Sequence, residues 1–519
     1  MRHGPGRSGR RGLRGSGQRG SGLPRTGVRG RGVRVRARRS AGARAGAAIV
    51  VPLLLTLVAA AGCDAGGPGA AGGSGGAAGS QPTAGAGATD LPGDIVLASG
   101  RDVTGKGGIR QQLIEQWNKE QESKGTGYRA RLVELPGSAD QQRSQLLGAL
   151  QSGSADYDVV NLDVTWVPEF AAAGLVRPLP DQLVDDDVIE SVAATSRWRD
   201  RVYAAPFNSD VGLLFYRRDY LQSAGVTQPD LGKDVRWPAV QKLFDTLDGA
   251  GRKLPDAYAK GWTTQLDASY EGLTVNGIEA FASATDGFAL TDAEGRYAGS
   301  VKELQKGLEE LRSRTQAAYT LPDAAQSDEA DTLTDFAGGR TGFLRHWPYA
   351  YRTLHQSLSE QQLGVARLPG KAVLGGQNLA VADRSKRSGA ALRLIEFLTG
   401  KESERCLLDA GFAATRRSAY VDDELVCKAA KPAGQATATP TGERTDRMPR
   451  DGSGRPGYAR GTLLPALENA VQRPRTPLYG AFTQTFTAEL GRLQGDKPPS
   501  AEELAKDLEA KLRRALSPE

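Results

Sequence analysis

Residues that carry out catalysis or bind metals are scarce in this chain. Its three histidines include His346 and His355, which lie nine residues apart with no H-E-x-x-H or other metal-ligand spacing around them. No G-x-S-x-G motif is present, and no cysteine stands in a motif typical of a nucleophile. The sequence therefore predicts no metal site, no catalytic residue and no cofactor.

One glycine-rich segment comes close to a phosphate-binding loop. Residues 100–107 (GRDVTGKG) follow a predicted strand and precede a predicted helix, as such a loop requires. However, Gly107 stands where the loop needs the Ser or Thr that holds magnesium. We therefore interpret the segment as a tight turn at a ligand cleft and not as a nucleotide site.

Aromatic and carboxylate residues occur together in short, non-repetitive segments. Carbohydrate sites combine flat rings, which cover the C–H faces of a sugar, with polar groups that bond its hydroxyls. A single ring is more often an ordinary core residue, but Trp166 stands just past a strand end beside Asp163, where ligand contact is favoured. The residues of this kind are Asp163, Trp166, Trp262, Tyr270, Glu271, Trp347 and Tyr349.

The charge of the chain is divided unevenly along its length. The net charge of the 519 residues is +7, but residues 1–62 hold fourteen arginines and no acidic residue, so the remainder is acidic overall. An acidic body has no general attraction for phosphates, which argues against nucleic-acid binding. With 39% hydrophobic residues, the remainder can form two or more folded domains.

The N-terminal segment has the features of an export signal. Arginines precede an apolar stretch, Ala47–Ala61, which is too short to span a bilayer and is interrupted by Pro52. Its end, AAGC, resembles a bacterial lipobox, after which Cys63 would be the lipidated first residue. The alternative is an ordinary signal with an incidental cysteine. Paired arginines at two places leave the export route, Sec or twin-arginine, open.

The segment after Cys63 predicts attachment to a membrane surface. Residues 63–92 are rich in Gly, Ala and Ser and are expected to form a flexible tether. A lipid, a tether and a folded body describe a protein held at the outer face of a bacterial cell membrane. In that oxidising compartment we expect Cys406 and Cys427 to form a disulfide, although the sequence alone leaves free thiols open.

The first part of the body alternates between strand and helix patterns. Strands are expected at 94–99, 128–135 and 157–162, with helices at 109–121 and around 143–150 between them. This order predicts an α/β fold in which helices cover a parallel sheet.

The second part is less regular. A strand is expected at 211–216, and residues 237–311 have mainly helical patterns. Residues 421–460 are rich in Pro, Gly and charge, which predicts a long exposed, mobile loop. A capping box at Ser500–Glu503 predicts a final helix, whose Leu504, Leu508 and Leu512 form one stripe.

Six segments in order resemble the extracellular solute-binding proteins of family 1, the sugar-binding lipoproteins of ABC transporters. The likeness runs from about Asp94 to about Leu490 and is strongest to the trehalose/maltose-binding group. The segments are YDVVNLDVTWVPEFAAAGLVRPL (157–179), YAAPFNSDVGLLFYRRDYL (203–221), SYEGLTVNGIEAF (269–281), GRTGFLRHWPYAYRTL (339–354), GVARLPG with GGQNLAVADRS (364–370 and 375–385), and LPALENAVQRPRTPLYGAF (464–482).

The resemblance implies a periplasmic-binding-protein-like fold, in which two α/β lobes are joined by a hinge and close on a ligand in the cleft between them. The first hinge crossing would be Tyr203–Asn208. The expected organisation is a lipoprotein signal with an Arg/Gly-rich extension at 1–62, a tether at 63–92, lobe 1 at 93–206 and 371–417, and lobe 2 at 207–370 and 418–519.

The resemblance also implies which residues contact the ligand. Arg143 and Asp163 would bond sugar hydroxyls from lobe 1, and Asp210 would do so from lobe 2. Trp347 would stack on a sugar ring, and Arg473 would supply a bidentate donor. Two of these have plain structural alternatives, because Asp210 could cap the hinge and Arg473 could pair with a surface carboxylate.

Three further positions qualify this set. Tyr270 and Glu271 lie in a matching segment and are included as ligand residues, although Glu271 could be structural. Relatives often have GGW where this chain has Gly375-Gly376-Gln377. Gln377 keeps hydrogen-bonding capacity but loses a flat apolar face, which leaves the preferred sugar open.

The function implied by the resemblance is capture without chemistry. A monomer would bind a sugar such as trehalose or maltose by hinge closure and deliver it to the permease subunits of an ABC importer. One alternative is a secreted glycosidase that uses two of Asp163, Asp210 and Glu271 as acid and base. Another is a sugar sensor or adhesin on the same fold.

Overall fold

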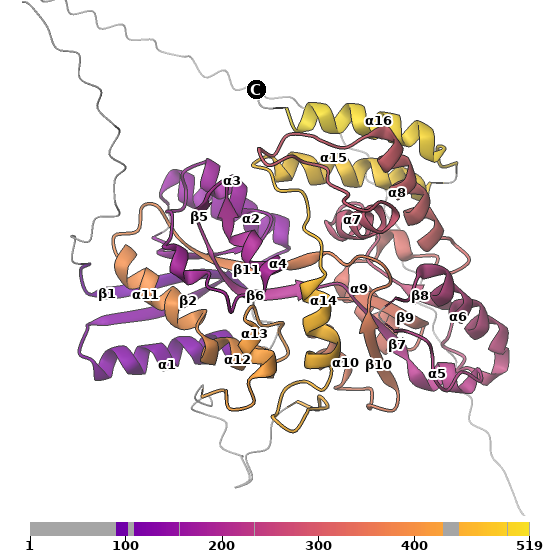
Figure 1. The fold of residues 1–519 in the computed structure, drawn as a ribbon, viewed down its shortest axis with the longest axis horizontal. Coiled ribbons are helices and arrows are strands. Elements are labelled where there is room, and N and C mark those ends of the chain that lie inside the picture. Colours follow the sequence, from indigo (N-terminus) through magenta and orange to yellow (C-terminus); the bar gives the residue numbers. More distant parts are fainter. Residues whose placement is uncertain are drawn as a thin grey trace, which may run out of the picture. The chain divides into compact units, whose positions relative to one another are not determined.

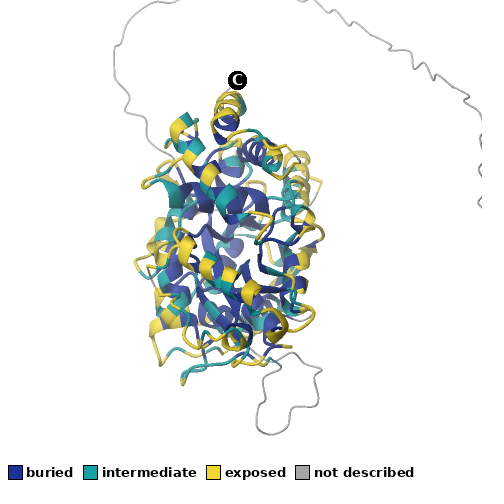
Figure 2. Ribbon diagram, turned by 90° about the vertical axis from the view of Figure 1, so that its right-hand side faces the viewer, coloured by how far each residue is buried: buried dark blue, intermediate teal, exposed yellow. Residues whose placement is uncertain are grey.

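The computed structural model describes the body of the chain, and all of the described residues belong to one compact unit, Thr83–Glu519. The signal segment, Cys63, most of the tether and the glycine-rich loop at 102–107 lie outside the described residues. Buried residues fill the interior of the body, and exposed residues lie on its outside (Figure 2). The described ranges are 90–101, 108–154, 156–232, 234–428, 446–495 and 497–517.

A five-stranded sheet forms the first lobe. Its order is β2-β1-β3-β11-β6, with β1 parallel to β2 and β3, and with β11 antiparallel to β3 and β6. The parallel arrangement expected of the first three strands is confirmed. The strands are β1 (Gly93–Gly100), β2 (Tyr128–Leu135), β3 (Val159–Asp163), β6 (Ala205–Val211) and β11 (Leu374–Val381).

Helices cover both faces of this sheet because its side chains alternate in direction. Ile95 and Leu97 of β1 pack with one group of helices, whereas Ala98 packs with another. The first group is α1 (Ile109–Ser123), α11 (Ser388–Leu398) and α12 (Lys401–Asp409), and the second is α2 (Ala139–Ser152) and α3 (Val167–Ala172). The expected α/β layering is therefore confirmed.

A four-stranded sheet forms the second lobe, in the order β10-β7-β9-β8. Its core includes Trp237 and Phe244 of α6 (Trp237–Ala250), whose rings pack on Trp262 of β8. The strand β8 lies within the region expected to be mainly helical. The strands are β7 (Leu213–Arg217), β8 (Lys260–Thr263), β9 (Thr341–His346) and β10 (Leu363–Arg367).

The C-terminal helices complete the second lobe. Helices α15 (Tyr479–Gly491) and α16 (Ala501–Ala515) lie beside α7 (Gly272–Ala284) and α8 (Val301–Arg314) (Figure 1). The capping box of Ser500 and Glu503 opens α16, and its three predicted leucines are buried. At Gly307 a side chain would collide with the ring of Phe281, so the close approach of α7 and α8 requires glycine.

The chain passes between the two sheets at Gly212, which joins β6 to β7. A Cβ at this glycine would lie 2.3 Å from the carboxylate of Glu279 and 2.9 Å from the guanidinium of Arg345. Strand β6 stays in the first sheet as far as Val211, so the boundary expected at 206–207 cuts this strand.

The remaining elements are no longer than nine residues, and β4 and β5 form a two-stranded sheet of their own. They are β4 (Arg197–Trp198), β5 (Arg201–Val202), α4 (Glu190–Ala193), α5 (Arg218–Ser223), α9 (Glu329–Ala337), α10 (Tyr349–Leu354), α13 (Arg417–Val421) and α14 (Leu464–Glu468). Among the described residues, no helix has the length and apolar character needed to cross a bilayer.

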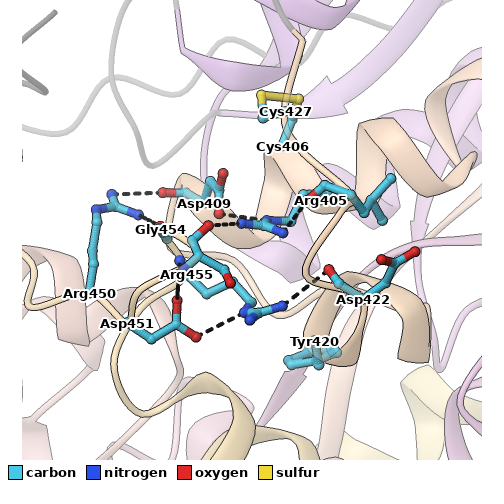
Figure 3. Close-up of polar contacts among 12 residues, drawn as sticks. Arg405, Cys406, Asp409, Tyr420, Asp422, Cys427, Arg450, Asp451, Gly454 and Arg455 are labelled. Carbon is cyan, nitrogen blue, oxygen red and sulfur yellow. Dashed lines mark hydrogen bonds and ion pairs between the residues drawn. A yellow bond between two sulfur atoms is a disulfide. The ribbon is translucent and has the colours of Figure 1, made fainter.

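A cluster of arginines ties residues 446–460 to α12 and α13, and we call it the arginine clamp (Figure 3). Arg405 bonds Asp409 at 2.9 Å and the carbonyls of Leu425 and Ser453. Arg455 bonds Asp451 at 2.9 Å and also pairs with Asp423. Its third member, Arg450, bonds Asp446 at 2.8 Å.

The arginine clamp corrects one expectation. Arg455 is 1% exposed, and Met448 and Tyr458 are also buried. Residues 446–460 are therefore packed against the body and do not form the exposed loop predicted from their composition. Beside the clamp, Cys406 and Cys427 form a disulfide (Figure 3).

Candidate functional site

Three of the expected ligand residues lie on neighbouring strands where the two lobes meet. In the first sheet, Gln377 of β11 is paired with Asp163 at the end of β3. Two residues earlier on β11, Gly375 is paired with Asp210 of β6. The sheet thus places two carboxylates and an amide at one edge, and all three side chains are partly exposed.

Arg473 connects this edge to the second lobe. Its guanidinium bonds Asp163 at 3.0 Å and Glu271, at the start of α7, also at 3.0 Å. The Arg473 side chain is 1% exposed, so both ion pairs are shielded from water. Burial alone would lower the pKa of Arg473, but the carboxylates of Asp163 and Glu271 outweigh that effect and raise it. Arg473 therefore holds two carboxylates from different lobes in place.

Glu329, the first residue of α9, forms hydrogen bonds with three aromatic side chains. Its carboxylate accepts hydrogen bonds from the Tyr270 hydroxyl at 2.5 Å, the Trp347 indole N–H at 2.6 Å and the Tyr349 hydroxyl at 3.1 Å. These bonds fix the orientation of the rings, all of which are partly exposed. The Arg345 guanidinium lies 3.9 Å from the centroid of the Trp347 ring and stacks on it.

Asp210 is the least satisfied carboxylate of the group. It makes no hydrogen bond or ion pair within the described part of the chain. A Cβ built on Gly375 would lie 3.2 Å from the Asp210 Cβ and 3.3 Å from the Trp347 ring, so these two side chains border the same glycine. Burial, together with repulsion from Glu329 and Asp163, raises the pKa of Asp210 to about 8.

Glu271 has a similar but weaker shift. Burial and the nearby carboxylates of Asp163, Asp140 and Glu329 raise its pKa to about 7, although the Arg473 guanidinium opposes the change. The site therefore contains two carboxyl groups whose charged forms are disfavoured before a ligand arrives.

Gln377 belongs to a buried polar network. Its side-chain oxygen accepts hydrogen bonds from Arg110 at 2.9 Å and from Asn161 at 2.6 Å. Arg110 also bonds Ser99 and Asn208, at 3.0 and 3.1 Å. The Gln377 oxygen is thus occupied by this network, while its amide N–H groups make no hydrogen bond among the described residues.

Arg143 pairs with a neighbour in its own lobe. It forms a bidentate ion pair with Glu169 of α3, at 2.7 and 2.5 Å. Arg143 also lines a cavity of about 370 Å³ together with Tyr270, Glu271 and residues of α15. Three of the expected residues therefore meet at this cavity, which borders the Arg473 ion pairs.

Trp166 does not lie with the others. It is 4% exposed and packs in the core with Leu162, Val167 and Phe170, because the chain turns into α3 directly after β3. This position favours the core alternative over the ligand contact that its place beside Asp163 suggested.

Sequence reasoning missed Glu329 and Arg110. Glu329 stands in an acidic helix start, DEAD, which resembles an ordinary capping box. Arg110 follows the glycine-rich segment, and the sequence does not distinguish it from the other polar residues of an amphipathic helix. Neither position carries a local signal, because their partners are distant in the sequence.

The described residues contain no group of three or more His, Cys, Asp or Glu side chains that could hold a metal ion. His346 and His355 are both buried, and burial lowers the pKa of each. The site instead offers hydrogen-bond acceptors, a few amide and guanidinium donors, and aromatic rings. Those groups can bind a polar, hydroxyl-rich molecule.

Comparison with known proteins agrees with this geometry. A profile described as "Bacterial extracellular solute-binding protein" matches residues 101–405, which is more than half of the chain. The chain belongs to this family of binding proteins. The match spans β3, β6, β9 and β11, and so includes most of the strands that carry the site.

One curated relative and two solved structures show the range of similar proteins. The relative is a probable ABC transporter-binding protein of Deinococcus radiodurans, 26% identical over 316 residues that cover 59% of this chain and 73% of that protein. Maltose-bound MalE3 of T. maritima has a TM-score of 0.62 at 22% identity, covering 81% of this chain and 99% of that one. The GacH receptor of Streptomyces glaucescens, solved unliganded and with acarbose, has a TM-score of 0.63 at 19% identity, covering 82% and 99%. At these identities the two structures establish the two-lobe fold.

Proposed function

We propose that this protein captures a sugar of about disaccharide size, such as trehalose or maltose, between its lobes and delivers it to the permease of an ABC importer. A lipid on Cys63 would hold it at the outer face of the bacterial cell membrane. The protein releases the sugar unchanged and works as a monomer without a cofactor.

The observation that carries this proposal is the meeting of polar and aromatic groups from both lobes. Asp163, Asp210 and Gln377 come from the first sheet, whereas Trp347 and Glu271 come from the second lobe. A ligand that bonds both sets favours the closed arrangement by its differential contacts. That closed form is the one the permease would recognise.

The residue roles in this proposal differ in part from those implied by the resemblance. Asp163 and Asp210 accept hydrogen bonds from sugar hydroxyls, and Trp347 covers a C–H face with the side of its ring that Arg345 leaves open. Arg473 acts mainly by holding Asp163 and Glu271, because both of its terminal nitrogens already bond carboxylates. Gln377 donates from its amide. Arg143, Tyr270 and Glu271 line the neighbouring cavity, where they contact a second sugar unit in this proposal.

The comparisons support the choice of ligand class. The similar structures were solved with maltose and with acarbose, and the curated relative is named for an ABC transporter. These statements concern those proteins, and we extend them to this chain because the candidate site has the rings and acceptors that a sugar needs.

A thermal-shift screen over mono- and disaccharides tests the proposal. A ligand that binds only the folded state raises Tm with its concentration. We expect one sugar or a small group, with trehalose and maltose included, to raise Tm in a saturable way. No shift with any sugar would contradict the proposal.

The same samples test the glycosidase alternative. After incubation, chromatography should recover the stabilising sugar intact. Appearance of hydrolysis products would show that two of the cleft carboxylates act as acid and base.

Attachment through Cys63 has its own test. Cells that express the full chain with a labelled fatty acid should yield labelled, membrane-bound protein, and Cys63→Ala should abolish the label. Labelling that persists in Cys63→Ala would rule out this anchor.

A further inference from the structure

A second cavity is lined in part by the segment that carries Arg473. Its volume is about 550 Å³, within the range of small-molecule sites. Three parts of the chain line it: the turn between β4 and β5, helix α7 with the loop that follows it, and residues 471–475. Neither the resemblance nor the proposed sugar site uses this cavity.

Arg475 places an unpaired positive charge in the lining. Its side chain is partly buried and makes no hydrogen bond or ion pair within the described ranges. Burial lowers the pKa of Arg475, and no carboxylate opposes that change. In contrast, the buried guanidiniums of Arg405 and Arg455 each bond a carboxylate. Burying a charge without a partner is costly, so an anion bound beside Arg475 would stabilise this position.

Arg199 contributes a second guanidinium at a strained backbone position. With φ of 53°, it is the one non-glycine residue with positive φ among the described residues. It stands in the two-residue turn between β4 and β5, where Gly, Asn or Asp normally occupies such a position. Its guanidinium lies 5.9 Å from the ring centroid of Trp198. Strain retained at the edge of a cavity points to a use for this side chain.

Arg473 borders the same cavity. Its terminal nitrogens bond Asp163 and Glu271, but its Nε is buried and has no partner among the described residues. The two acidic residues of the lining do not neutralise the arginines. Asp292 is bonded to Arg296 at 2.9 Å. The exposed Asp200 carries one negative charge, whereas Arg199 and Arg475 together carry two positive charges.

The rest of the lining is apolar. Trp198, Ile278 and Leu290 are buried, and Phe288 is partly exposed. A ligand with a flat or aliphatic body would cover these side chains while its charged group met the arginines.

We infer that this cavity binds a small organic anion, whose carboxylate or phosphate group lies between Arg199 and Arg475 and whose apolar body packs on Trp198 and Phe288. Of the residues assigned to the proposed sugar site, only Arg473 lines this cavity. The proposal does not depend on the identity of the sugar.

Calorimetric titration at low ionic strength tests the inference with four probes: benzoate, phenyl phosphate, inorganic phosphate and benzyl alcohol. Benzoate or phenyl phosphate should bind saturably with Kd of about 1 mM or below, and the tighter of the two identifies the anion class. Inorganic phosphate lacks the apolar body and benzyl alcohol lacks the charge, so each should bind at least about tenfold more weakly. If neither organic anion saturates below about 10 mM, or if benzyl alcohol binds equally well, the inference is wrong.

Three variants separate loss of the site from loss of the fold. Arg475→Gln and Arg199→Gly should each weaken binding of the organic anion about tenfold or more, whereas Arg252→Gln, which changes an exposed arginine in the turn after α6, should leave it unchanged. Glycine relieves the positive φ at position 199, so Tm of Arg199→Gly should equal or exceed that of the parent. Binding that is unaltered in both site variants would overturn the inference.

Discussion

The arginine clamp and the proposed sugar site, which we call the cleft and which includes Asp163, Asp210, Glu271 and Trp347, are two charged regions in which the charges are paired differently. In the clamp, Arg405 and Arg455 are almost fully buried, and both are bonded to carboxylates and to backbone carbonyls (Figure 3). In the cleft, Asp210 has no partner among the described residues, and Glu271 shares one arginine with Asp163. The charged groups of Arg405 and Arg455 thus have partners within the protein, whereas the Asp210 carboxylate has none among the described residues.

This difference distinguishes charged groups that stabilise the fold from charged groups that we propose bind a ligand. A buried, fully bonded arginine is strongly destabilising to remove, because its partners stay behind unpaired. A desolvated carboxylate without a partner costs stability and persists where function needs it. Substitutions in the clamp should therefore destabilise the fold, whereas substitutions in the cleft should weaken binding without destabilising the fold.

The largest effect is expected in the clamp. Arg405→Ala leaves the Asp409 carboxylate and two carbonyls without their donor, and should lower the free energy of unfolding by about 3–5 kcal/mol. Urea denaturation measures this, with Arg252→Ala as the exposed control. A loss below about 1 kcal/mol would mean that the clamp is not a stabilising structure.

The disulfide should give the next largest effect. Cys406 and Cys427 are separated by 21 positions, and closing a loop of that size stabilises by about 3 kcal/mol in the chain-entropy description. Urea unfolding with and without a reductant should differ by this amount, and the double variant Cys406→Ser/Cys427→Ser should match the reduced protein. Sugar affinity should stay the same. A parallel fall in affinity would show that the two regions are coupled.

Asp210→Asn should change stability in the opposite direction. The folded-state pKa of about 8 lies above the ordinary 3.8, so Asp210 stabilises the fold in its protonated form and this contribution is lost as pH rises from about 4 to about 8. Asparagine stays neutral, so the variant should exceed the parent in stability at pH 8, with no such gain at pH 4. Unfolding at both pH values measures this. Equal pH profiles for variant and parent would show that Asp210 is not held desolvated.

The smallest effect concerns the orientation of the rings. Glu329→Ala removes the acceptor shared by Tyr270, Trp347 and Tyr349, and should weaken sugar binding by about 1 kcal/mol, or roughly fivefold. The exposed Glu309→Ala on α8 is the control. Unchanged calorimetric affinity in Glu329→Ala would mean that the rings keep their positions without this carboxylate.

Much of the fold follows from local patterns. The strand at 128–135 has the predicted bounds, and the capping box at Ser500 starts α16 as expected. These elements are predictable because neighbouring residues decide them. By contrast, β8 was missed because it is short and stands between long helical patterns. Residues 446–458 form a loop without a helix or strand, as their composition predicts, but the predicted exposure was wrong because nothing in the composition shows that Arg455 is buried.

The site was only partly predictable for the same reason. The sequence and the resemblance predicted Asp163, Asp210 and Trp347 as ligand residues. The sheet register places Asp163 and Asp210 beside β11, and Trp347 borders Gly375 of the same strand. The part played by Glu329 depends on its hydrogen bonds with Tyr270 and Trp347, which are 59 and 18 positions away in the sequence. Long-range contacts of this kind leave no pattern in a single sequence.

Titration calorimetry with the sugar that gives the largest thermal shift tests the central claim most directly. The parent protein should bind one equivalent, and Trp347→Ala and Asp163→Ala should each weaken binding by about tenfold or more, equivalent to about 1.4 kcal/mol, while Arg252→Ala does not. Unchanged affinity in both cleft variants, or the absence of saturable binding by the parent, would contradict the account.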